Sequence, residues 1–342
     1  MVQKKKNISE LRQDLVSGDW VVIALARGKR PHAFASGAKP KKQEAPISQC
    51  PFEGLSEKKE KSFVRYDYRQ GGHTTGWSVI AVSNKFPAFS KGACNSFSKE
   101  GPYTMAEGVG SHEVFILRDH KRYIPDLDAE EMINLVRAYR ERYRSLEHEK
   151  CVAYVLVFHN HGREAGASLS HPHSQLIAMP VIPPDVSRSL RGSERFFHEH
   201  GTCVHCEMIQ YELRVKKRII DENERFVAFT PFASKVAFEV RIAPKIHQPN
   251  FGMLEDDDLA LVAKMLQKQL ARLRNGLNDP SYNFFIHTAP DGEKHGHYHW
   301  HIEILPKTSI WAGFEMGTGI EISAIAPEDA AAFLRKVKTI AV

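Results

Sequence analysis

The chain has 342 residues, of which 42% are hydrophobic and 10% aromatic, and its formal net charge at pH 7 is +6. These values are ordinary for a globular protein with a substantial core, in one large or two medium domains. No apolar run approaches the roughly 20 residues needed to cross a bilayer, which argues against a membrane function, and the modest basic excess suits phosphate-bearing metabolites better than nucleic acid.

The cysteines favour a reduced, cytoplasmic protein. Their number is odd, only two of them are close in sequence, and the chain shows no apolar signal segment. They are Cys50, Cys94, Cys151, Cys203 and Cys206.

The first predicted strand, residues 20–24, ends in a basic turn that contains Arg27 and Arg30. Basic residues around a glycine at a strand end can meet an anion, or they can form a solvated turn. A later strand, 77–82, leads into a second turn, which contains Asn84.

Residues 113–117 predict another strand, and 128–149 predict an amphipathic helix, because apolar side chains recur there at helical spacing. These side chains are Met132, Leu135, Val136, Tyr139 and Tyr143. A buried strand over 154–158 then leads through Asn160 to residues 166–180, the stretch around which the chain is organised.

This stretch runs from small residues through two histidines into an apolar strand. Alternate side chains of a strand share a face, so one face carries chemistry and the other belongs to the core. The first face holds His171, His173 and Gln175, and the second holds Leu176 and Ala178. Gly166 and Ser168 allow amides and a hydroxyl to donate to a phosphate, to which Gln175 can also donate. The neutral imidazole of His173 is a competent nucleophile toward phosphorus.

A bare His-x-His is more often a metal pair or a pair of satisfied surface groups. Here the Gly-Ala-Ser lead-in and the trailing glutamine favour phosphate chemistry.

The second half repeats the first at an offset of 126 residues. The residue types of Val114, Ile116, His171, His173 and Pro180 recur as Val240, Ile242, His297, His299 and Pro306. A helix over 256–275 and a strand over 282–286 recur as well. The duplication predicts an α+β chain of two repeats, 1–185 and 186–342, each an antiparallel sheet with a packed helix, related by a pseudo-twofold axis. The second copy lacks the small residues and the glutamine, so the reaction is assigned to the first.

Cys203 and Cys206 have Cys-x-x-Cys spacing, and with two distant histidines they have the composition of a structural zinc site. A redox pair is the alternative, but no thioredoxin-like strand and helix surround them. Residues 309–319 form a glycine-rich loop, and 327–337 predict a closing helix that starts at a proline.

The segment Asn160–Gln175, with His-Pro-His at 171–173, resembles the active-site signature of the galactose-1-phosphate uridylyltransferase family, a branch of the histidine-triad superfamily. The resemblance extends from about Leu11 to Val337. It implies two histidine-triad-like repeats and a covalent nucleotidyl group on His173, with Ser168 and Gln175 assisting.

The same resemblance implies the remaining site residues. Phosphate, nucleoside and hexose contacts are expected from Arg27, Arg30, Asn84, Asn160, Gly166, Gly313, Phe314 and Glu315. A first zinc site is expected from Cys50, Glu53, His112 and His171, and a second from Cys203, Cys206, His247 and His299, with His287 and His301 as alternative ligands. Glu53 stands where the family has a second cysteine, so the first site is expected to hold zinc more weakly and less selectively.

The function implied is exchange of a nucleoside monophosphate between a nucleoside-diphosphate hexose and a hexose 1-phosphate, of the UDP-glucose type. One alternative is an ADP-glucose phosphorylase or adenylyltransferase that uses phosphate as the acceptor. Another, of a different class, is a zinc-organised nucleic-acid-binding protein, which leaves the Gly-Ala-Ser and His-Pro-His run unexplained. A homodimer whose active sites borrow residues across the interface is expected.

Overall fold

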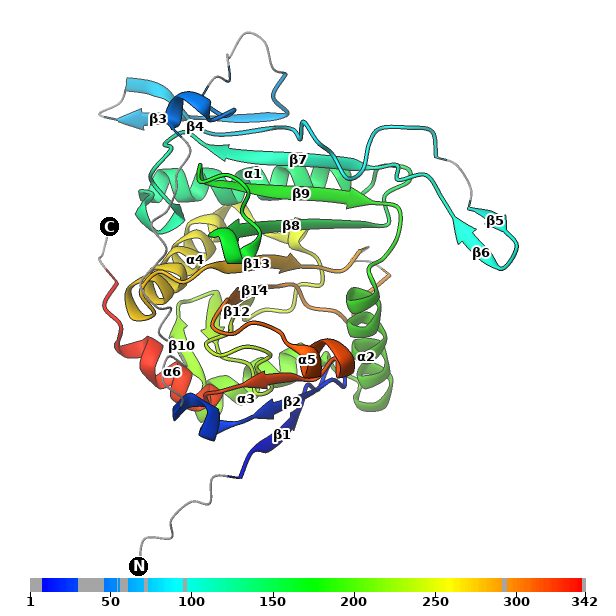
Figure 1. The fold of residues 1–342 in the computed structure, drawn as a ribbon, viewed down its shortest axis with the longest axis vertical. Helices are drawn as coiled ribbons and strands as arrows, with labels where there is room; N and C mark the ends of the chain where they lie inside the picture. The colour runs from blue at the N-terminus through cyan, green and yellow to red at the C-terminus, as the bar shows by residue number, and fades with distance from the viewer. Residues whose placement is uncertain are drawn as a thin grey trace, which may run out of the picture.

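The computed structural model describes residues 8–29, 46–53, 55, 61–70, 73–94, 97–290 and 294–339. Its main feature is a ten-stranded sheet in which all neighbouring strands pair antiparallel. In spatial order the strands are β10 (Ile219–Glu222), β11 (Phe226–Phe229), β12 (Val240–Pro244), β14 (His301–Pro306), β13 (Tyr282–His287), β8 (Tyr154–His161), β9 (His173–Met179), β7 (Ser111–Leu117), β4 (His73–Ser83) and β3 (Val64–Gln70) (Figure 1).

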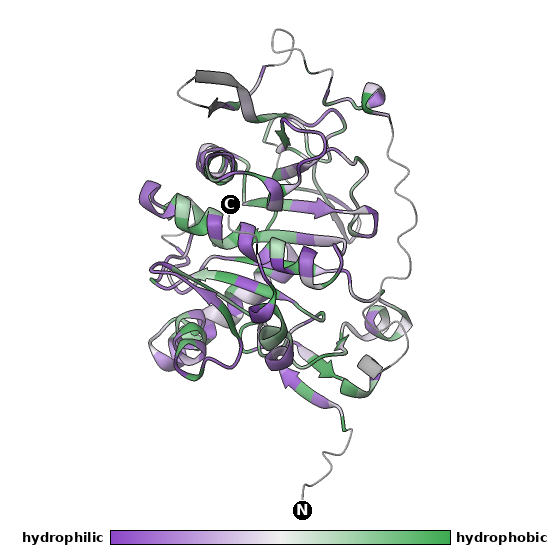
Figure 2. Cartoon of the chain, turned by 90° about the vertical axis from the view of Figure 1, so that its left-hand side faces the viewer, coloured by the Kyte–Doolittle hydropathy of each residue, from purple (hydrophilic) through white to green (hydrophobic). Residues whose placement is uncertain are grey.

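Two long helices, α1 (Ala129–Leu146) and α4 (Asp256–Gly276), cover one face of this sheet. Both lie where the apolar periodicity predicts them, and their buried stripes join the largest hydrophobic cluster of the described residues. Helix α1 begins at a capping box, in which Asp128 accepts from the amide of Glu131 and the Glu131 carboxylate accepts from the amide of Asp128. Figure 2 shows that hydrophobic and hydrophilic residues both occur along the helices, as expected of helices that cover a sheet.

Smaller elements surround this core. A three-stranded sheet joins β1 (Glu10–Gln13), β2 (Trp20–Ile23) and β15 (Glu321–Ser323), and a hairpin of β5 (Ser98–Glu100) and β6 (Tyr103–Met105) projects from the body (Figure 1). The other helices are α2 (Pro184–His200), α3 (Val204–Val215), α5 (Gly313–Thr318) and α6 (Pro327–Lys336). Short 3-10 turns are η1 (Leu25–Lys29), η2 (Ile47–Gln49), η3 (Ile124–Asp126), η4 (Arg163–Ala165) and η5 (Phe251–Met253).

The α+β class is confirmed, and the two halves share one sheet because β8 pairs with β13 at its centre. The offset of 126 is corrected, however, because His173 and His301 each begin the corresponding strands, β9 and β14. The His-x-His pair at 171 and 173 therefore corresponds to His299 and His301. The division at 185 and 186 stays a prediction.

The expectation that all cysteines are reduced is wrong for Cys94 and Cys151, which form a disulfide with Cα atoms 5.5 Å apart. It links the segment that follows β4 to the turn that follows α1. In the described part of the chain, no helix has both the length and the apolar character needed to cross a bilayer.

Candidate active site

The pairing register of β7, β8 and β9 brings the predicted catalytic side chains onto one face of the sheet. Gln175 on β9 pairs with Phe158 on β8 and with Val114 on β7. Residues that pair across two strands lie on the same face of the sheet, and so do residues two positions apart along one strand. Gln175 therefore shares its face with His173, Asn160 and His112, whereas Ser174 points to the opposite face and bonds Tyr139 of α1.

His173 is held in one tautomer by its own strand. Its Nδ1 lies 2.8 Å from the carbonyl oxygen of His171, and because a carbonyl can only accept, Nδ1 carries the proton and Nε2 keeps its lone pair. The side chain is buried, and this burial lowers the pKa of His173, so that the ring is neutral at neutral pH. A neutral imidazole with a free nitrogen can attack phosphorus.

The loop before β9 presents backbone to the same face. Gly162 and Gly166 have φ of 80° and 86°, a region that favours glycine, and a Cβ on Gly162 would lie 2.2 Å from Oγ of Ser281. Side-chain Nδ2 of Asn160 lies near Gly166, 3.9 Å from the place of its missing Cβ. Ser168 is exposed in this loop. Amides, a hydroxyl and the Asn160 side chain thus lie together, as anion binding requires.

Asn84 also reaches this face. Its Nδ2 lies 3.0 Å from Nε2 of His112 and 3.5 Å from Oε1 of Gln175. The same His112 nitrogen is 2.8 Å from Oε1 of Gln175.

The expected first metal site is built differently from the prediction. Cys50, His120 and His171 bring one ligand atom each to within 4.8 Å of one another. His112 is not among them, since its ring contacts Gln175 and the Ala88 amide instead. The structure places His120 where the prediction has His112, and His120 is therefore the better candidate for this ligand. Oε1 of Glu53 lies 3.2 Å from Nδ1 of His120 and 3.6 Å from Nδ1 of His171, so this carboxylate lies beside the two histidines but outside the group of three.

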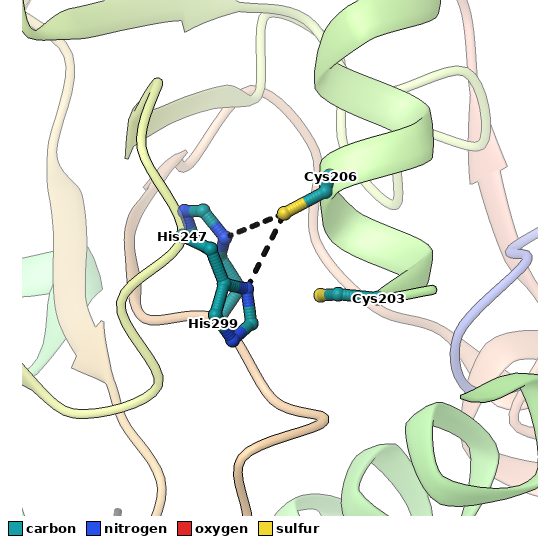
Figure 3. Close-up of side chains that lie close together, drawn as sticks. All are labelled: Cys203, Cys206, His247 and His299. Carbon is teal, nitrogen blue, oxygen red and sulfur yellow. Dashed lines mark hydrogen bonds between the residues drawn. The ribbon is translucent and has the colours of Figure 1, made fainter. Parts of the chain in front are cut away.

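The second group is the predicted one: Cys203, Cys206, His247 and His299 bring their ligand atoms within 4.8 Å (Figure 3). His287 and His301, the alternatives, are not in it; their rings stack on each other with centroids 5.0 Å apart. The grouping of both cysteines with two histidines favours metal binding over a redox pair. A hydrogen bond from Cys206 lowers the pKa of the Cys203 thiol, so that the pair readily supplies a thiolate.

Both groups fit zinc. A sulfur and a nitrogen bound to one zinc ion lie about 3.5 Å apart, given bonds of about 2.3 and 2.0 Å. Sγ of Cys206 is 3.3 Å from Nδ1 of His247 and 3.5 Å from Nδ1 of His299, and Sγ of Cys50 is 3.6 Å from Nδ1 of His171. The Nε2 atoms of His247, His299 and His171 donate to backbone carbonyls, which is the usual anchor of a metal-binding histidine.

The counterpart of the His173 face in the second half is filled with charge. His301 repeats the tautomer bond, with Nδ1 3.2 Å from the carbonyl of His299, but the residue at the position of Gln175 is Glu303. Arg241, which pairs with Glu303 across β12 and β14, donates to it at 3.2 Å, and His287 lies 3.0 Å from its other oxygen. These groups are largely buried, and Glu303 puts a carboxylate where the first half has the neutral Gln175, which disfavours an anion on this face.

The predicted hexose and phosphate contacts divide between two places. Arg27 lies 4.0 Å from Glu315, which with Gly313 and Phe314 belongs to α5. Figure 1 places α5 and β2 beyond β12 and β14, well away from the start of β9. Within one chain the structure therefore does not bring Arg27 and Glu315 to His173. Arg30 lies outside the described residues.

Sequence reasoning missed His120 and Asn283. Comparison of the two halves could have found the first, because Arg118-Asp119-His120 follows β7 as Lys245-Ile246-His247 follows β12. Asn283 donates to Asn160 and to the loop from another strand, and no local pattern indicates this.

Comparison with known proteins relates the chain to one enzyme family. Residues 1–183 match the model of the family described as galactose-1-phosphate uridyl transferase, N-terminal domain, and residues 109–339 match a domain of unknown function, DUF4921. The chain is 35% identical to an ADP-glucose phosphorylase of Arabidopsis thaliana, over 96% of this chain and 93% of the relative. It is 29% identical to a galactose-1-phosphate uridylyltransferase of Thermotoga maritima, over 96% and 98%.

Solved structures give the same picture. An ADP-glucose phosphorylase from Arabidopsis thaliana with bound ADP-glucose superposes with a TM-score of 0.79 and 32% identity, over 97% of this chain and 99% of that one. A structure of a uridylyltransferase superposes with a TM-score of 0.73 and 27% identity, over 96% and 97%.

Proposed function

The chain belongs to the galactose-1-phosphate uridylyltransferase family, and from this premise we propose that it transfers a nucleotidyl group from a nucleoside-diphosphate hexose to inorganic phosphate through a covalent bond to His173. The observation that carries the proposal is the buried, neutral His173 ring with its free Nε2 on the face that holds Gln175 and Asn160. ADP-glucose is the proposed donor, because the 35% identical relative is an ADP-glucose phosphorylase and a similar structure holds ADP-glucose.

The reaction has two steps. Nε2 of His173 attacks the α-phosphorus, a P–N bond forms, and the bond from that phosphorus to the bridging oxygen breaks and releases glucose 1-phosphate. An oxygen of inorganic phosphate then attacks the same phosphorus, the P–N bond breaks, and ADP leaves. In the first step the electron pair of the broken P–O bond leaves with glucose 1-phosphate, and in the second step the electron pair of the P–N bond returns to Nε2 of His173. No atom changes oxidation state, so no redox partner is needed.

Charge on the nonbridging oxygens is stabilised by donors fixed before the substrate arrives. The amides around Gly166, the Ser168 hydroxyl, and the side-chain amides of Asn160 and Gln175 supply these donors in a partly buried site. Fixed donors of this kind typically account for a factor of about 100 to 1,000 each in rate.

We expect both metal groups to hold zinc in a structural role. Zinc would fix the ring of His171, whose carbonyl sets the tautomer of His173, and His171 would then not be free to act as a base.

We further propose a homodimer in which the partner supplies the hexose contacts. The support is the separation within one chain of α5, with Gly313, Phe314 and Glu315, from the start of β9. Arg27 would reach the partner subunit's active site together with Glu315, because its guanidinium lies 4.0 Å from the Glu315 carboxylate.

The test is capture of the nucleotide. We expect protein incubated with ADP-glucose labelled in the adenosine to retain label after denaturation, and to release it as ADP when phosphate is added. The His173→Ala variant should fold and retain none. Undiminished labelling of this variant would eliminate His173, and absence of labelling of the native protein by any nucleotide sugar would eliminate the reaction.

The second candidate is a UDP-hexose to hexose 1-phosphate uridylyltransferase, favoured by the family match and by the Thermotoga maritima relative. Labelling by UDP-glucose in place of ADP-glucose, with discharge by galactose 1-phosphate and not by phosphate, would replace the first proposal with this one.

A further inference from the structure

His112 lies on the active face but outside both metal groups. It is on β7, two residues before Val114, the strand partner of Gln175. Its half-buried ring lies between the backbone of Ala88 and the side chain of Gln175.

The protonation of this ring follows from its partners. The amide of Ala88 donates to Nδ1 at 3.1 Å, and because an amide nitrogen can only donate, Nδ1 carries the lone pair. In the neutral ring the proton is therefore on Nε2. That nitrogen is 2.8 Å from Oε1 of Gln175 and donates to it.

Asn84 presents a second donor to the same oxygen. Its Oδ1 accepts from the amide of Phe86 at 2.9 Å, so its Nδ2 faces the site, 3.5 Å from Oε1 of Gln175. This Nδ2 also lies 3.0 Å from Nε2 of His112, a contact between two donors that is unfavourable unless an acceptor lies beside both, and the Gln175 oxygen is that acceptor. A flipped Gln175 would turn its NH2 toward two other donors, which is unfavourable.

The consequence concerns the other end of the Gln175 amide. With its oxygen held by His112, the NH2 group faces away from β7, on the face where His173 stands. A phosphate oxygen beside His173 needs a hydrogen-bond donor, and a flipped Gln175 amide would place its carbonyl oxygen, an acceptor, at that position. In the second half, the corresponding positions carry Glu239 and Glu303, and neither side chain has the NH2 group that Gln175 offers to a phosphate oxygen.

We propose that His112 is a positioning residue, which fixes the Gln175 amide with its NH2 toward the transferred phosphoryl group. This inference rests on the proposed nucleotidyl transfer and adds to it a residue that acts only through Gln175.

The experiment is a double-mutant cycle on the rate of nucleotide capture, measured in single turnovers at saturating and subsaturating ADP-glucose. We expect His112→Leu to lower the capture rate about 10-fold, with a smaller change in the concentration needed for half-saturation, and Gln175→Ala to lower it about 100-fold. In the Gln175→Ala background, His112→Leu should have no further effect. His112→Gln, which keeps a donor near the place of Nε2, should restore most of the rate.

Two controls separate this role from a structural one. His148→Leu replaces an exposed histidine, with 83% of its side chain accessible, and should leave the rate unchanged. Zinc content and thermal unfolding of His112→Leu should match those of the native protein. A rate loss that persists in the Gln175→Ala background, or a loss of zinc, would overturn the proposal.

A readout without turnover keeps the two proposals distinguishable. The side-chain amide signals of Gln175, assigned with the Gln175→Ala variant, should be a single sharp pair in the native protein and in His112→Gln, and broadened or shifted in His112→Leu. Identical signals in all three would refute the positioning role even if nucleotide capture succeeds. Absence of capture in the native protein would instead refute the proposed function.

Discussion

Asn283 donates its side-chain amide to Oδ1 of Asn160 at 2.8 Å and to the carbonyl oxygen of Ala165, also at 2.8 Å. The two asparagines are direct partners across β13 and β8, where the halves of the sheet meet. A residue of the second half therefore holds the loop before β9 of the first half, the proposed anion site. Asn283 bonds the side-chain oxygen of Asn160, so the NH2 group of Asn160 can still donate to a ligand.

Asn283→Ala should weaken both the loop and the fold. We expect the capture rate to fall about 10- to 100-fold, because the Asn160 amide and the loop lose their fixed geometry. The free energy of unfolding should fall by about 1–3 kcal/mol, since one buried and one partly buried acceptor lose their donor. Single-turnover kinetics and urea unfolding measure the two effects. Asn275→Ala, which removes a comparable bond to the Lys338 carbonyl at the surface, is the control and should leave the rate unchanged.

The two metal groups should differ in how readily they lose zinc. The first offers one thiolate and a carboxylate that is 36% exposed, whereas the second offers two thiolates. We expect a limiting amount of chelator to remove one equivalent quickly and the second slowly, as metal analysis over time would record. Glu53→Cys should slow the first loss. Equal rates of loss from both groups, in the native protein and in this variant, would contradict the assignment.

The choice between His120 and His112 as a zinc ligand can be tested directly. His120→Leu should remove one equivalent of zinc, and His112→Leu should remove none, because only His120 has its Nδ1 beside that of His171, at 3.1 Å. Zinc quantitation on the two purified variants decides between them. The reverse outcome would restore His112 as the ligand.

The disulfide should contribute to stability under oxidising conditions. Cys94 and Cys151 are 57 residues apart. In the chain-entropy model, closing a loop of this length lowers the conformational entropy of the unfolded chain and so raises the free energy of unfolding by about 4 kcal/mol. We expect a reducing agent to lower the unfolding midpoint of the native protein and to have no such effect on the Cys94→Ser, Cys151→Ser double variant. Thiol titration of the oxidised, unfolded, metal-free chain should find Cys50, Cys203 and Cys206 free. Five free thiols would contradict the bond.

Buried Glu239 should make stability depend on pH. Burial and the neighbouring Glu303 raise the pKa of Glu239 to about 8, so the folded protein keeps a proton that the unfolded chain releases above its ordinary pKa of 4.5. The unfolded state then binds fewer protons, and the contribution of Glu239 to the free energy of unfolding falls as the pH rises from about 4.5 to 8, by at most about 1.4 kcal/mol per pH unit. Glu239→Gln removes this dependence. Between pH 6 and pH 8, the thermal unfolding midpoint of the variant should rise relative to that of the native protein. The same change in midpoint for both proteins would contradict the raised pKa of Glu239.

The sequence by itself determined what depends on neighbours along the chain. The apolar spacing predicts α1 and α4 because helical side chains of one face recur every three to four residues. His171, His173 and Gln175 are spaced two residues apart, which predicts that they share one face of a strand, because successive side chains of a strand point to opposite faces. Cys203 and Cys206 lie within one turn at the start of α3, so their spacing already indicates a shared ligand.

Only the tertiary structure decided which distant groups meet. The choice of His120 over His112, the bond from Asn283 to Asn160 and the pairing of Cys94 with Cys151 all depend on strand register and on the lengths of the connecting loops. A shift of two residues keeps every side chain on its face, so periodicity cannot tell an offset of 126 from the pairing of His173 with His301. Hydrogen bonds and packing across the sheet select one register, and that register fixed the ligands and the neighbours of His173.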